Sequence, residues 1–443
     1  MDIRSVLFMK KLYKILIIIL LIFSLVALSL LSFYSPVSLE DDTSFLVNTK
    51  TISKTEFNLL STDSPIFIGW ARTNFTPNGV VHNTRGLFQE PYEDVLDSLF
   101  INCIYLKKDT VQFVILSYDL LLVTPELASS VKMELLSRGI SNVYFSASHT
   151  HSSIGGFGKG VAAEIALGEF DQSIFGGIID RTIVTLDKAI QIQDTLQNIS
   201  YKEKKVNRAI NRLIGEYYVE ERIRQVHFSS TRHLAVMNSL NIHPTFVSSE
   251  RKVISKDYPK IFSKEKTTEF GMFVAGAMGS IKPMSFKRDT SQITRFKAII
   301  DTTQYSVDDS TLRTDLIGFS SIKLVTPSLR PLLTENICSS KLLSSVLIGI
   351  PKISIEVLRI GEVLMIALPC ELSSEFYFEL QKLADAKGMR LIITSFNGSY
   401  VGYATPSRNF HINHMETRTM NWTGKYGGDY FNELVRLIIE KQA

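Results

Sequence analysis

Cysteine and histidine are scarce in this sequence, which has 3 cysteines and 8 histidines among 443 residues. The cysteines, Cys103, Cys338 and Cys370, are too few and too scattered for a disulfide framework or a zinc knuckle. The net charge of +4 is mild and forms no basic stripe, so nothing indicates binding to nucleic acid. What remains is a globular chain of ordinary composition, long enough for one large domain or two fused halves.

One long uncharged run stands out near the N-terminus. Residues 15–34 read ILIIILLIFSLVALSLLSFY, and as a helix at about 1.5 Å per residue this run is about as long as the ~30 Å bilayer core. A basic tail, residues 1–14, precedes it and acidic residues 40–42 follow. The positive-inside rule therefore predicts a transmembrane anchor with a cytoplasmic tail and the rest of the chain outside the cytoplasm, periplasmic, extracellular or luminal. A cleaved signal peptide is the alternative, although its apolar part should be shorter and ALSLLS is a poor cleavage site.

The body of the chain alternates strand-like and helix-like segments. Residues 35–63 are polar and patternless, typical of a linker, and we expect one folded domain over residues 64–443. VQFVILSYDLLLV, PELASSVKMELLSRG and NVYFSAS read as strand, helix and strand. Near the C-terminus, ISIEVLRIG and EVLMIAL read as a hairpin-like pair, ELSSEFYFELQKLADAKG as a helix, and MRLIITSF as a strand. The pattern predicts an α/β fold, a mixed β-sheet core flanked by helices, with ligands bound where strands end.

Two histidines lie one residue apart in SASHTHSSIGGFG, residues 146–158. Residues i and i+2 of a strand point to the same face, so His149 and His151 can converge on one object, and the Gly155-Gly156 pair lets the backbone approach it. Neutral imidazole is the commonest nitrogen ligand of metals. Because an isolated pair can also be ordinary core or surface histidine, a metal site needs a second ingredient.

Further candidates follow other strand-like runs. His243 ends one such run in NSLNIHPTF, and Glu371 comes directly after another in IALPCEL. Tyr400 and Tyr403 lie on a glycine-broken loop, NGSYVGYATP. Taken singly, Glu371 can be the acid that a helix N-terminus favours, and each tyrosine can be amphipathic packing.

Taken in order, these stretches resemble the neutral ceramidase family. That family carries GVARTDITP, THTHSGPGG, NR, HP, SADYPG, PGE and a tyrosine after an asparagine-bearing strand. The corresponding stretches here are GWARTNFTP, SHTHSSIGG, INR, IHP, SKDYP, PCE and NGSYVGY. The resemblance runs from about residue 66 to the end of the chain, without the C-terminal β-rich domain of full-length neutral ceramidases.

The resemblance implies a zinc amidase that hydrolyses the N-acyl bond of ceramide-like lipids. It implies one zinc per chain, with ligands His149, His243, Glu371 and Tyr403. His151 and Arg212 match family residues that act beside the metal. Two neutral imidazoles, one carboxylate and a phenol would leave zinc with low net charge and room for a water molecule.

The resemblance breaks at the catalytic serine. The family has GDVSP where this chain has MGSIKP, which puts Lys282 at the serine's position and Ser280 at the aspartate's. Met415 stands where the family has a second tyrosine, and Glu416 keeps the neighbouring acid. We expect zinc-bound hydroxide to be the nucleophile with Lys282 as an accessory group, and Ser280 displaced by two residues is the alternative.

The sequence therefore predicts a membrane-anchored zinc hydrolase of N-acyl compounds, with amide hydrolysis favoured over ester hydrolysis. Its partners would be a lipid-like N-acyl substrate and the membrane, with no nucleic acid. The alternative is a non-catalytic relative that binds a lipid or another ligand and retains the metal pocket as structure.

Overall fold

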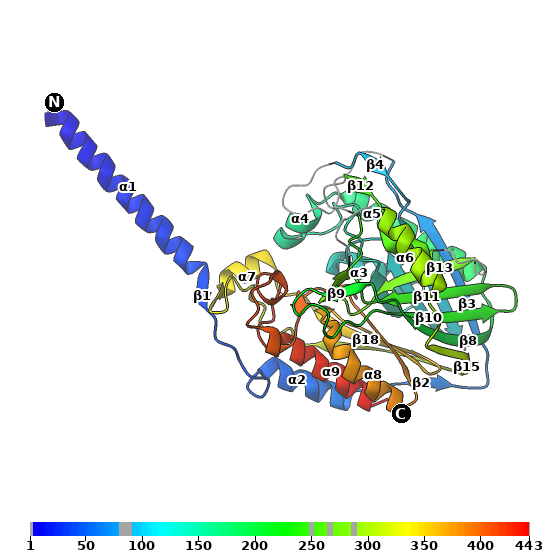
Figure 1. Cartoon of the computed structure of the whole chain (residues 1–443). Helices are drawn as coiled ribbons and strands as arrows, with labels where there is room; N and C mark the ends of the chain where they lie inside the picture. The colour runs from blue at the N-terminus through cyan, green and yellow to red at the C-terminus, as the bar shows by residue number, and fades with distance from the viewer. Residues whose placement is uncertain (1–2, 79–90, 248–251, 264–268, 285–289, 443) are drawn as a thin grey trace.

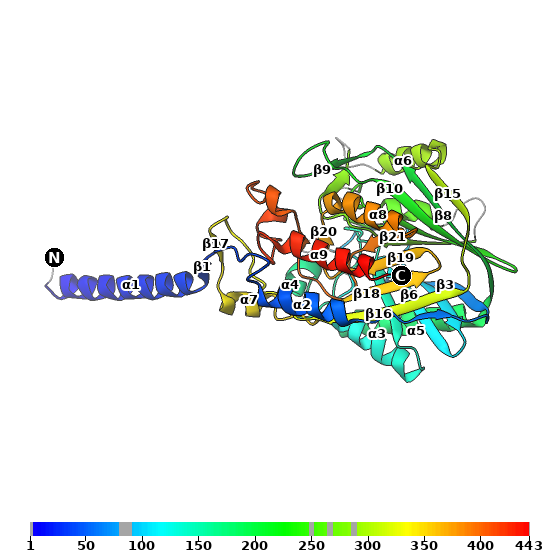
Figure 2. The same cartoon turned by 90° about the horizontal axis from the view of Figure 1, so that it is seen from below.

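The computed structural model describes residues 3–78, 91–247, 252–263, 269–284 and 290–442. Two β-sheets packed face to face form its centre, and helices cover the outer face of each sheet (Figure 1). Helix α1 (Ile3–Ser29) projects away from this body (Figure 2). The fold is thus of the expected α/β class, with mixed sheets flanked by helices.

The larger sheet contains the strand, helix and strand that the sequence predicted. Strand β6 (Val111–Tyr118) leads into α3 (Pro125–Ser137) and then into β7 (Asn142–Ala147), which pairs in parallel with β6. The Thr124 hydroxyl caps α3 by accepting from the Leu127 amide. In spatial order the sheet runs β13 (Phe270–Ala275), β11 (Leu234–Leu240), β10 (Arg222–Ser230), β8 (Asp194–Lys205), β3 (Ile66–Asn74), β5 (Phe100–Lys108), β6 and β7, and β15 (Val307–Leu312) also pairs with β8.

The smaller sheet contains the predicted hairpin near the C-terminus. It runs β2 (Leu59–Ser61), β16 (Leu316–Leu324), β18 (Ile353–Ile360), β19 (Val363–Ala367) and β21 (Arg390–Thr394). Strands β18 and β19 are antiparallel, and β19 is parallel to β21.

The helix before β21 starts later than the sequence predicted. Helix α8 covers Tyr377–Ala386, because Glu371–Leu372 instead form strand β20, which pairs with β22 (Tyr403–Ala404). A short 3-10 helix, η2 (Ser374–Phe376), connects β20 to α8. The start of the expected helix is therefore taken up by the strand that carries Glu371.

Three apolar clusters hold the layers together, so the central strands are buried on both faces as expected. Side chains such as Ile104 of the larger sheet and Met365 of the smaller sheet meet between the two sheets. The outer face of the larger sheet packs on α3 and α5 (Gln172–Gln191). The outer face of the smaller sheet packs on α8 and α9 (Gly427–Glu440). Apolar side chains fill the space between the layers, so polar functional side chains are expected at the ends of the strands.

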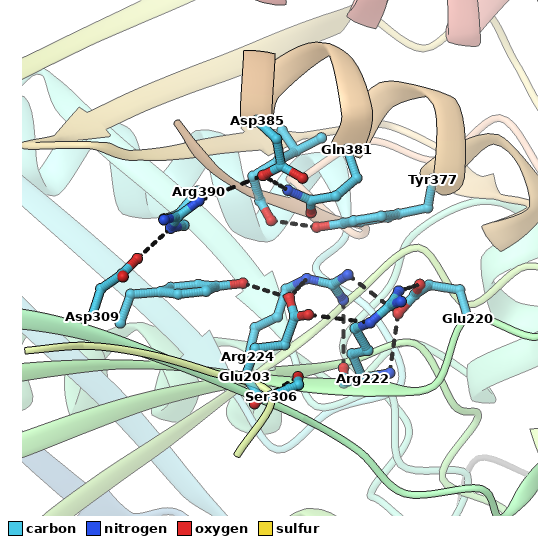
Figure 3. A network of polar contacts seen from close by, with 12 residues as sticks. Glu203, Glu220, Arg222, Arg224, Ser306, Asp309, Tyr377, Gln381, Asp385 and Arg390 are labelled. Carbon is cyan, nitrogen blue, oxygen red and sulfur yellow. Dashed lines mark hydrogen bonds and ion pairs between the residues drawn. The ribbon is translucent and has the colours of Figure 1, made fainter. Parts of the chain in front are cut away.

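A buried ion network also connects the two halves of the sandwich. Arg224 on β10 is 1% exposed, and its guanidinium lies 3.4 Å from a carboxylate oxygen of Glu203 and 3.2 Å from one of Glu220 (Figure 3). The ring of Tyr377, the first residue of α8, covers this guanidinium at 4.1 Å. The network thus links the larger sheet to the helix that packs on the smaller one.

The N-terminal run does not form the predicted transmembrane helix of residues 15–34. Helix α1 ends at Ser29, and Leu31–Phe33 leave it to form β1, which pairs with β17 (Ile337–Ser339). The uncharged part of α1, residues 15–29, is about 22 Å long at about 1.5 Å per residue, short of the ~30 Å bilayer core. Within the described residues, no helix combines the length and apolar composition that crossing a membrane requires.

The segment predicted to be a linker, residues 35–63, is partly helical. It contains α2 (Thr43–Lys54), which packs beside α9, and Ile52 of α2 is fully buried in the cluster outside the smaller sheet. The Asp42 side chain caps α2 by accepting from the Phe45 amide. The segment is therefore part of the folded body, because its few apolar residues pack on α9.

The remaining elements are short and lie around the ends of the sheets. They are β4 (Asp94–Val95), α4 (Val161–Leu167), β9 (Ala209–Asn211), β12 (Val253–Ile254), η1 (Tyr258–Phe262), β14 (Ile281–Pro283), α6 (Ser291–Thr302), α7 (Lys341–Leu347), η3 (Ser407–Asn409) and η4 (Met415–Thr417).

Candidate metal centre

Four of the residues predicted to bind a metal come from strand ends of both sheets. His149 follows β7 and His243 follows β11 of the larger sheet, whereas Glu371 follows β19 of the smaller sheet. Glu371 and Tyr403 are directly opposite each other in the parallel pair of β20 and β22. Because the sheets pack face to face, these ends meet in one buried place, and all four residues are at most 4% exposed.

The side-chain oxygens and nitrogens of these residues converge. His243 Nε2 lies 3.0 Å from Glu371 Oε2 and 3.1 Å from the Tyr403 hydroxyl. His149 Nε2 lies 3.6 Å from the same Glu371 oxygen. A single cation between these atoms would contact both imidazoles, the carboxylate and the phenol.

Backbone carbonyls determine which nitrogen of each imidazole carries the proton. His149 Nδ1 lies 2.7 Å from the Leu121 carbonyl oxygen, and His243 Nδ1 lies 2.8 Å from that of Ile281. A carbonyl oxygen only accepts hydrogen bonds, so both Nδ1 atoms donate and both Nε2 atoms of the neutral rings present a lone pair. Such bonds are the usual way in which a protein orients histidines around a metal.

These lone pairs make the site suitable for a cation. Without a proton, His243 Nε2 presents its lone pair to a carboxylate oxygen at 3.0 Å, an arrangement that a positive charge between the two atoms would resolve. The Nε2 atoms of His149 and His151 are buried and have no hydrogen-bond partner among the described residues. Orphaned buried nitrogens of this kind are costly unless they have a ligand. The donor set therefore fits a metal ion.

His151, which was predicted to act beside the metal, lies among the residues that could bind it. Each of His149, His151 and His243 offers a ring nitrogen, and these atoms lie within 4.8 Å of one another. The His151 ring is 4.9 Å from that of His149 and 6.1 Å from that of His243. Within the described chain, this histidine trio could hold a metal ion, and Glu371 and Tyr403 border it.

The ionisation of the cluster also suits a metal. Burial lowers the pKa of all three histidines, to about 4 for His243 and well below the usual range for His151, so the rings are neutral at neutral pH. Burial would raise the pKa of Glu371, but contacts with His149, His243 and the Tyr400 hydroxyl outweigh burial and lower the pKa. Burial raises the pKa of Tyr403 well above its usual value. Neutral imidazoles beside an ionised carboxylate are the forms that bind metals.

Two aromatic residues support the cluster from behind. The Tyr400 hydroxyl donates to Glu371 Oε1 at 2.6 Å, and the Phe396 ring stacks on His149 with centroids 4.2 Å apart. The sequence placed Tyr400 and Tyr403 on one loop, and the structure gives each a different contact with the site. Phe396 was missed, because its only sequence signal is its place between the end of β21 and the asparagine of NGSY.

Arg212 lies beside the cluster with its own buried partner. Its Nη1 donates to Glu416 Oε1 at 2.8 Å, and its side chain is 14% exposed. Burial alone would lower the pKa of Arg212, but Tyr403 and Glu416 raise it, so the guanidinium stays charged. The electrostatic influence of Arg212 reaches all three histidines, whose pKa values it helps to lower.

Ser280 and Lys282 have their contacts away from the imidazole nitrogens. Ser280 is fully buried, and its hydroxyl accepts from Ser373 at 2.9 Å and lies 3.5 Å from the Ser374 hydroxyl. Lys282 is exposed on β14. Among the described residues, neither side chain contacts the histidine trio.

The backbone around Ser280 nevertheless supports the site. The Ser280 carbonyl accepts from the Arg212 amide at 2.8 Å, and the next carbonyl holds His243. The Gly279 amide donates to the Leu372 carbonyl. A Cβ at Gly279 would come within 2.3 Å of the Glu371 carbonyl oxygen, so this close approach requires glycine.

Comparison with known proteins identifies the fold. No family model and no curated protein matches the sequence. The solved neutral ceramidase of Pseudomonas aeruginosa aligns with a TM-score of 0.69 at 14% identity, over 85% of this chain and 74% of that chain. A ceramidase complexed with C2 aligns with a TM-score of 0.68 at 15% identity, over 86% of this chain and 76% of that chain. The chain therefore has a divergent neutral ceramidase-like fold.

Proposed function

We propose that this chain, whose fold is that of the neutral ceramidases, is a zinc-dependent hydrolase of the N-acyl amide bond in ceramide-like lipids or related compounds. One observation carries the proposal: two neutral imidazole nitrogens converge on a buried, ionised carboxylate inside that fold. Orphaned imidazole nitrogens beside a carboxylate point to a bound cation, which the fold alone does not. A non-catalytic relative that retains the metal pocket is the alternative, and turnover distinguishes the two.

His149, His243, Glu371 and Tyr403 would hold the zinc, with His151 at its side. Zinc accepts nitrogen and oxygen ligands of these kinds in four-coordinate sites. When bound, zinc would polarise the amide carbonyl and lower the pKa of a water molecule. The Leu121 and Ile281 carbonyl oxygens orient the imidazoles of His149 and His243, because they accept from the two Nδ1 atoms.

Two further residues supply charge and proton transfer. Arg212 is a largely buried, permanent cation beside the cluster, where a reduced dielectric strengthens its attraction for negative charge that develops on the amide. His151 is neutral at working pH and its Nε2 has no partner among the described residues. It can take a proton from an attacking water or return one to the departing amine.

The surroundings of Ser280 support a reaction that does not use it as nucleophile. Its hydroxyl is fully buried and bonded to Ser373, and among the described residues it makes no hydrogen bond to any of the three histidines that could act as its base. Lys282 lies near enough to Glu416 and His414 to contribute to their pKa values. Burial is the larger influence on both groups, and the Lys282 charge lowers both. We assign Lys282 an accessory role beside Glu416 and His414.

The decisive experiment joins metal analysis with turnover. Purified protein is analysed for bound metals and incubated with N-acyl sphingosines and other N-acyl amines of different acyl length. We expect about one zinc per chain and release of fatty acid. His243→Ala should lose both, and His233→Ala, which changes an exposed histidine paired with Glu269, should lose neither.

Two results would contradict the proposal. Full zinc occupancy in His243→Ala would show that the ligand set is wrong. Zinc binding with N-acyl lipid binding but no release of fatty acid would favour the non-catalytic relative.

A further inference from the structure

Glu375 is a buried carboxylate that the proposed reaction does not use. Its side chain is fully buried, at the start of the segment that leads from β20 into α8. Its Oε1 accepts from Asn409 at 2.7 Å, from Asn211 at 3.3 Å and from Ser373 at 3.4 Å. Its Oε2 accepts from Arg408 at 2.7 Å. Four donors from three separate segments therefore meet on one side chain.

The first connection from Glu375 leads to the turn that carries Arg212. Asn211, held by Glu375 through its amide nitrogen, directly precedes Arg212. The oxygen of the same Asn211 side chain accepts from the backbone amides of Leu213 at 2.9 Å and Ile214 at 3.3 Å. Asn211 is 1% exposed, so water does not replace these bonds. The orientation of the Arg212 turn thus depends on a residue that Glu375 holds in place.

The second connection reaches Arg212 from the other side. Ser373 lies between Glu375 and Ser280, with its hydroxyl 3.4 Å from the carboxylate and 2.9 Å from the Ser280 hydroxyl. The Ser280 carbonyl in turn accepts from the Arg212 amide at 2.8 Å. Antiparallel pairing of β9 with β14 continues this contact, with Asn211 opposite Ile281. Glu375 therefore contacts Asn211 of β9 directly and reaches Ser280, just before β14, through Ser373.

We propose that Glu375 is a positioning residue that sets Arg212 against the metal centre through Asn211 and through Ser373 and Ser280. The proposal rests on the proposed function, in which Arg212 stabilises charge that develops during hydrolysis. A carboxylate suits this place because its two oxygens accept from Asn211, Asn409 and Arg408 at once. The Ser373 hydroxyl lies beside them, and its one proton goes either to Ser280 or to Glu375. Loss of its oxygens would leave the buried amides of Asn211 and Asn409 without a partner. The contact between Arg212 and Glu416 would then lose its support from the Asn211 side.

The test compares two substitutions of Glu375. Glu375→Met keeps the length of the side chain and removes every acceptor, whereas Glu375→Gln keeps one oxygen for Asn211 and Asn409. We expect Glu375→Met to lower kcat about tenfold or more with zinc content and KM little changed, in the range that changes behind an active site usually cause. Glu375→Gln should restore most of kcat. Glu203→Met is the control, since it removes a buried glutamate of the ion network in Figure 3 that does not contact the Arg212 turn.

A double-mutant cycle separates positioning from general destabilisation. If Glu375 acts through Arg212, then Glu375→Met should change kcat less than about twofold in the Arg212→Lys background. Full additivity would overturn the proposal, and so would a Glu375→Met variant that melts lower but keeps the wild-type kcat in its folded fraction.

A structural readout keeps the test independent of turnover. In a crystal structure of Glu375→Met we expect Arg212 to leave its 2.8 Å contact with Glu416. If the wild-type protein proves inactive on all N-acyl compounds, the proposed function fails, and this structure still decides the role of Glu375. An unmoved Arg212 would refute it.

Discussion

At the scale of single residues, the candidate metal centre depends on which nitrogen of each imidazole carries the proton, and neighbouring groups decide this. The Nδ1 bonds to Leu121 and Ile281 decide that His149 and His243 turn their Nε2 lone pairs toward Glu371. The same principle applies to Ser280, whose hydroxyl is engaged by Ser373 rather than directed at the histidines. A neighbouring group thus decides what each of these side chains can do: a backbone carbonyl for each histidine and the Ser373 hydroxyl for Ser280.

Ser280 provides the first prediction. Because its hydroxyl is buried among serines, we expect Ser280→Ala to keep full zinc content and to lower kcat on an N-acyl substrate less than about tenfold, since it removes only the Ser373 link to the Arg212 turn. Lys282→Ala, at an exposed position, should alter KM or kcat by less than about tenfold. Steady-state rates with parallel metal analysis check both. A Ser280→Ala variant that is zinc-loaded and dead, beside a near-normal Lys282→Ala, would make Ser280 the nucleophile.

Asp119 provides a prediction about pH. It is 5% exposed, and burial raises its pKa to about 6 although Lys256 and the Phe100 amide act against the shift. An acid with a raised folded pKa contributes stability fully below its unfolded pKa of about 4, and that contribution is lost as pH rises through about 6. The Phe100 amide donates to the Asp119 carboxylate at 2.8 Å. In Asp119→Asn the side chain no longer titrates, and its amide oxygen can still accept this hydrogen bond.

We therefore expect Asp119→Asn to gain stability relative to wild type as pH rises from about 4 to about 6. The gain in the free energy of unfolding should be on the order of 3 kcal/mol, since each pKa unit corresponds to about 1.4 kcal/mol. Urea unfolding of both proteins at several pH values measures it. Parallel stability curves across this range would show that Asp119 does not titrate as stated.

At the scale of elements, short strands rather than long helices decide where the functional residues lie. The strand β20 interrupts the expected helix and brings Glu371 opposite Tyr403. The strand β1 interrupts the expected membrane helix and joins it to β17. Both strands are short and lack a strong hydrophobic period, so they depend on pairing partners that are distant in the sequence.

The pairing of β1 predicts where the chain can be shortened. Tyr34, just after β1, accepts from the Lys425 amide at 2.7 Å and donates from its own amide to Asn336 at 2.8 Å. A chain that begins at Leu30 keeps these bonds, and we expect it to melt within about 2 °C of the full chain. A chain that begins at Val37 loses them and should melt roughly 4 °C lower or more. Equal melting temperatures for the two shortened chains would show that β1 contributes nothing.

At the scale of the whole molecule, charged residues add to the apolar packing that holds the two sheets together. Arg390 of β21 pairs with Asp309 of β15 at 2.5 Å, and the Arg224 guanidinium of β10 contacts the Tyr377 ring of α8, so one ion pair and one ring contact bridge the layers (Figure 3). The metal centre lies at the ends of the same two sheets. His149 and His243 follow strands of the larger sheet and Glu371 follows a strand of the smaller sheet, so a change that moves the two sheets apart would separate the histidines from Glu371.

Arg224 provides the prediction at this scale. Arg224→Met should lower the free energy of unfolding by about 2 kcal/mol, because Glu203 and Glu220 would lose their buried cation and keep only Arg222, whose side chain is 33% exposed. Urea denaturation measures the loss. Arg232→Met, which breaks an exposed pair with Asp194, serves as the control and should unfold at nearly the wild-type urea concentration. A loss for Arg224→Met no larger than that of the control would contradict the structural role of the network.

The sequence by itself determined the α/β class, the strand, helix and strand unit around α3, and the hairpin of β18 and β19. These features can be predicted from the sequence because their signals are local. Hydrophobic periodicity, a capping residue such as Thr124 and a glycine after a helix each act within a few residues. The rule that polar residues at strand ends share an edge also led to His149, His243 and Glu371 before any coordinates. The extracytoplasmic location expected from the N-terminal charges stays a prediction.

Only the tertiary structure decided how these residues meet. The site unites residues from His149 to Glu416, and the distances between them follow from the packing of two sheets and from the register of short strands. The same packing turned Ser280 toward Ser373 and gave Glu375 its four donors. Local sequence rules cannot reach such contacts, because each one joins segments whose separation in the chain is far longer than a helical turn or a strand.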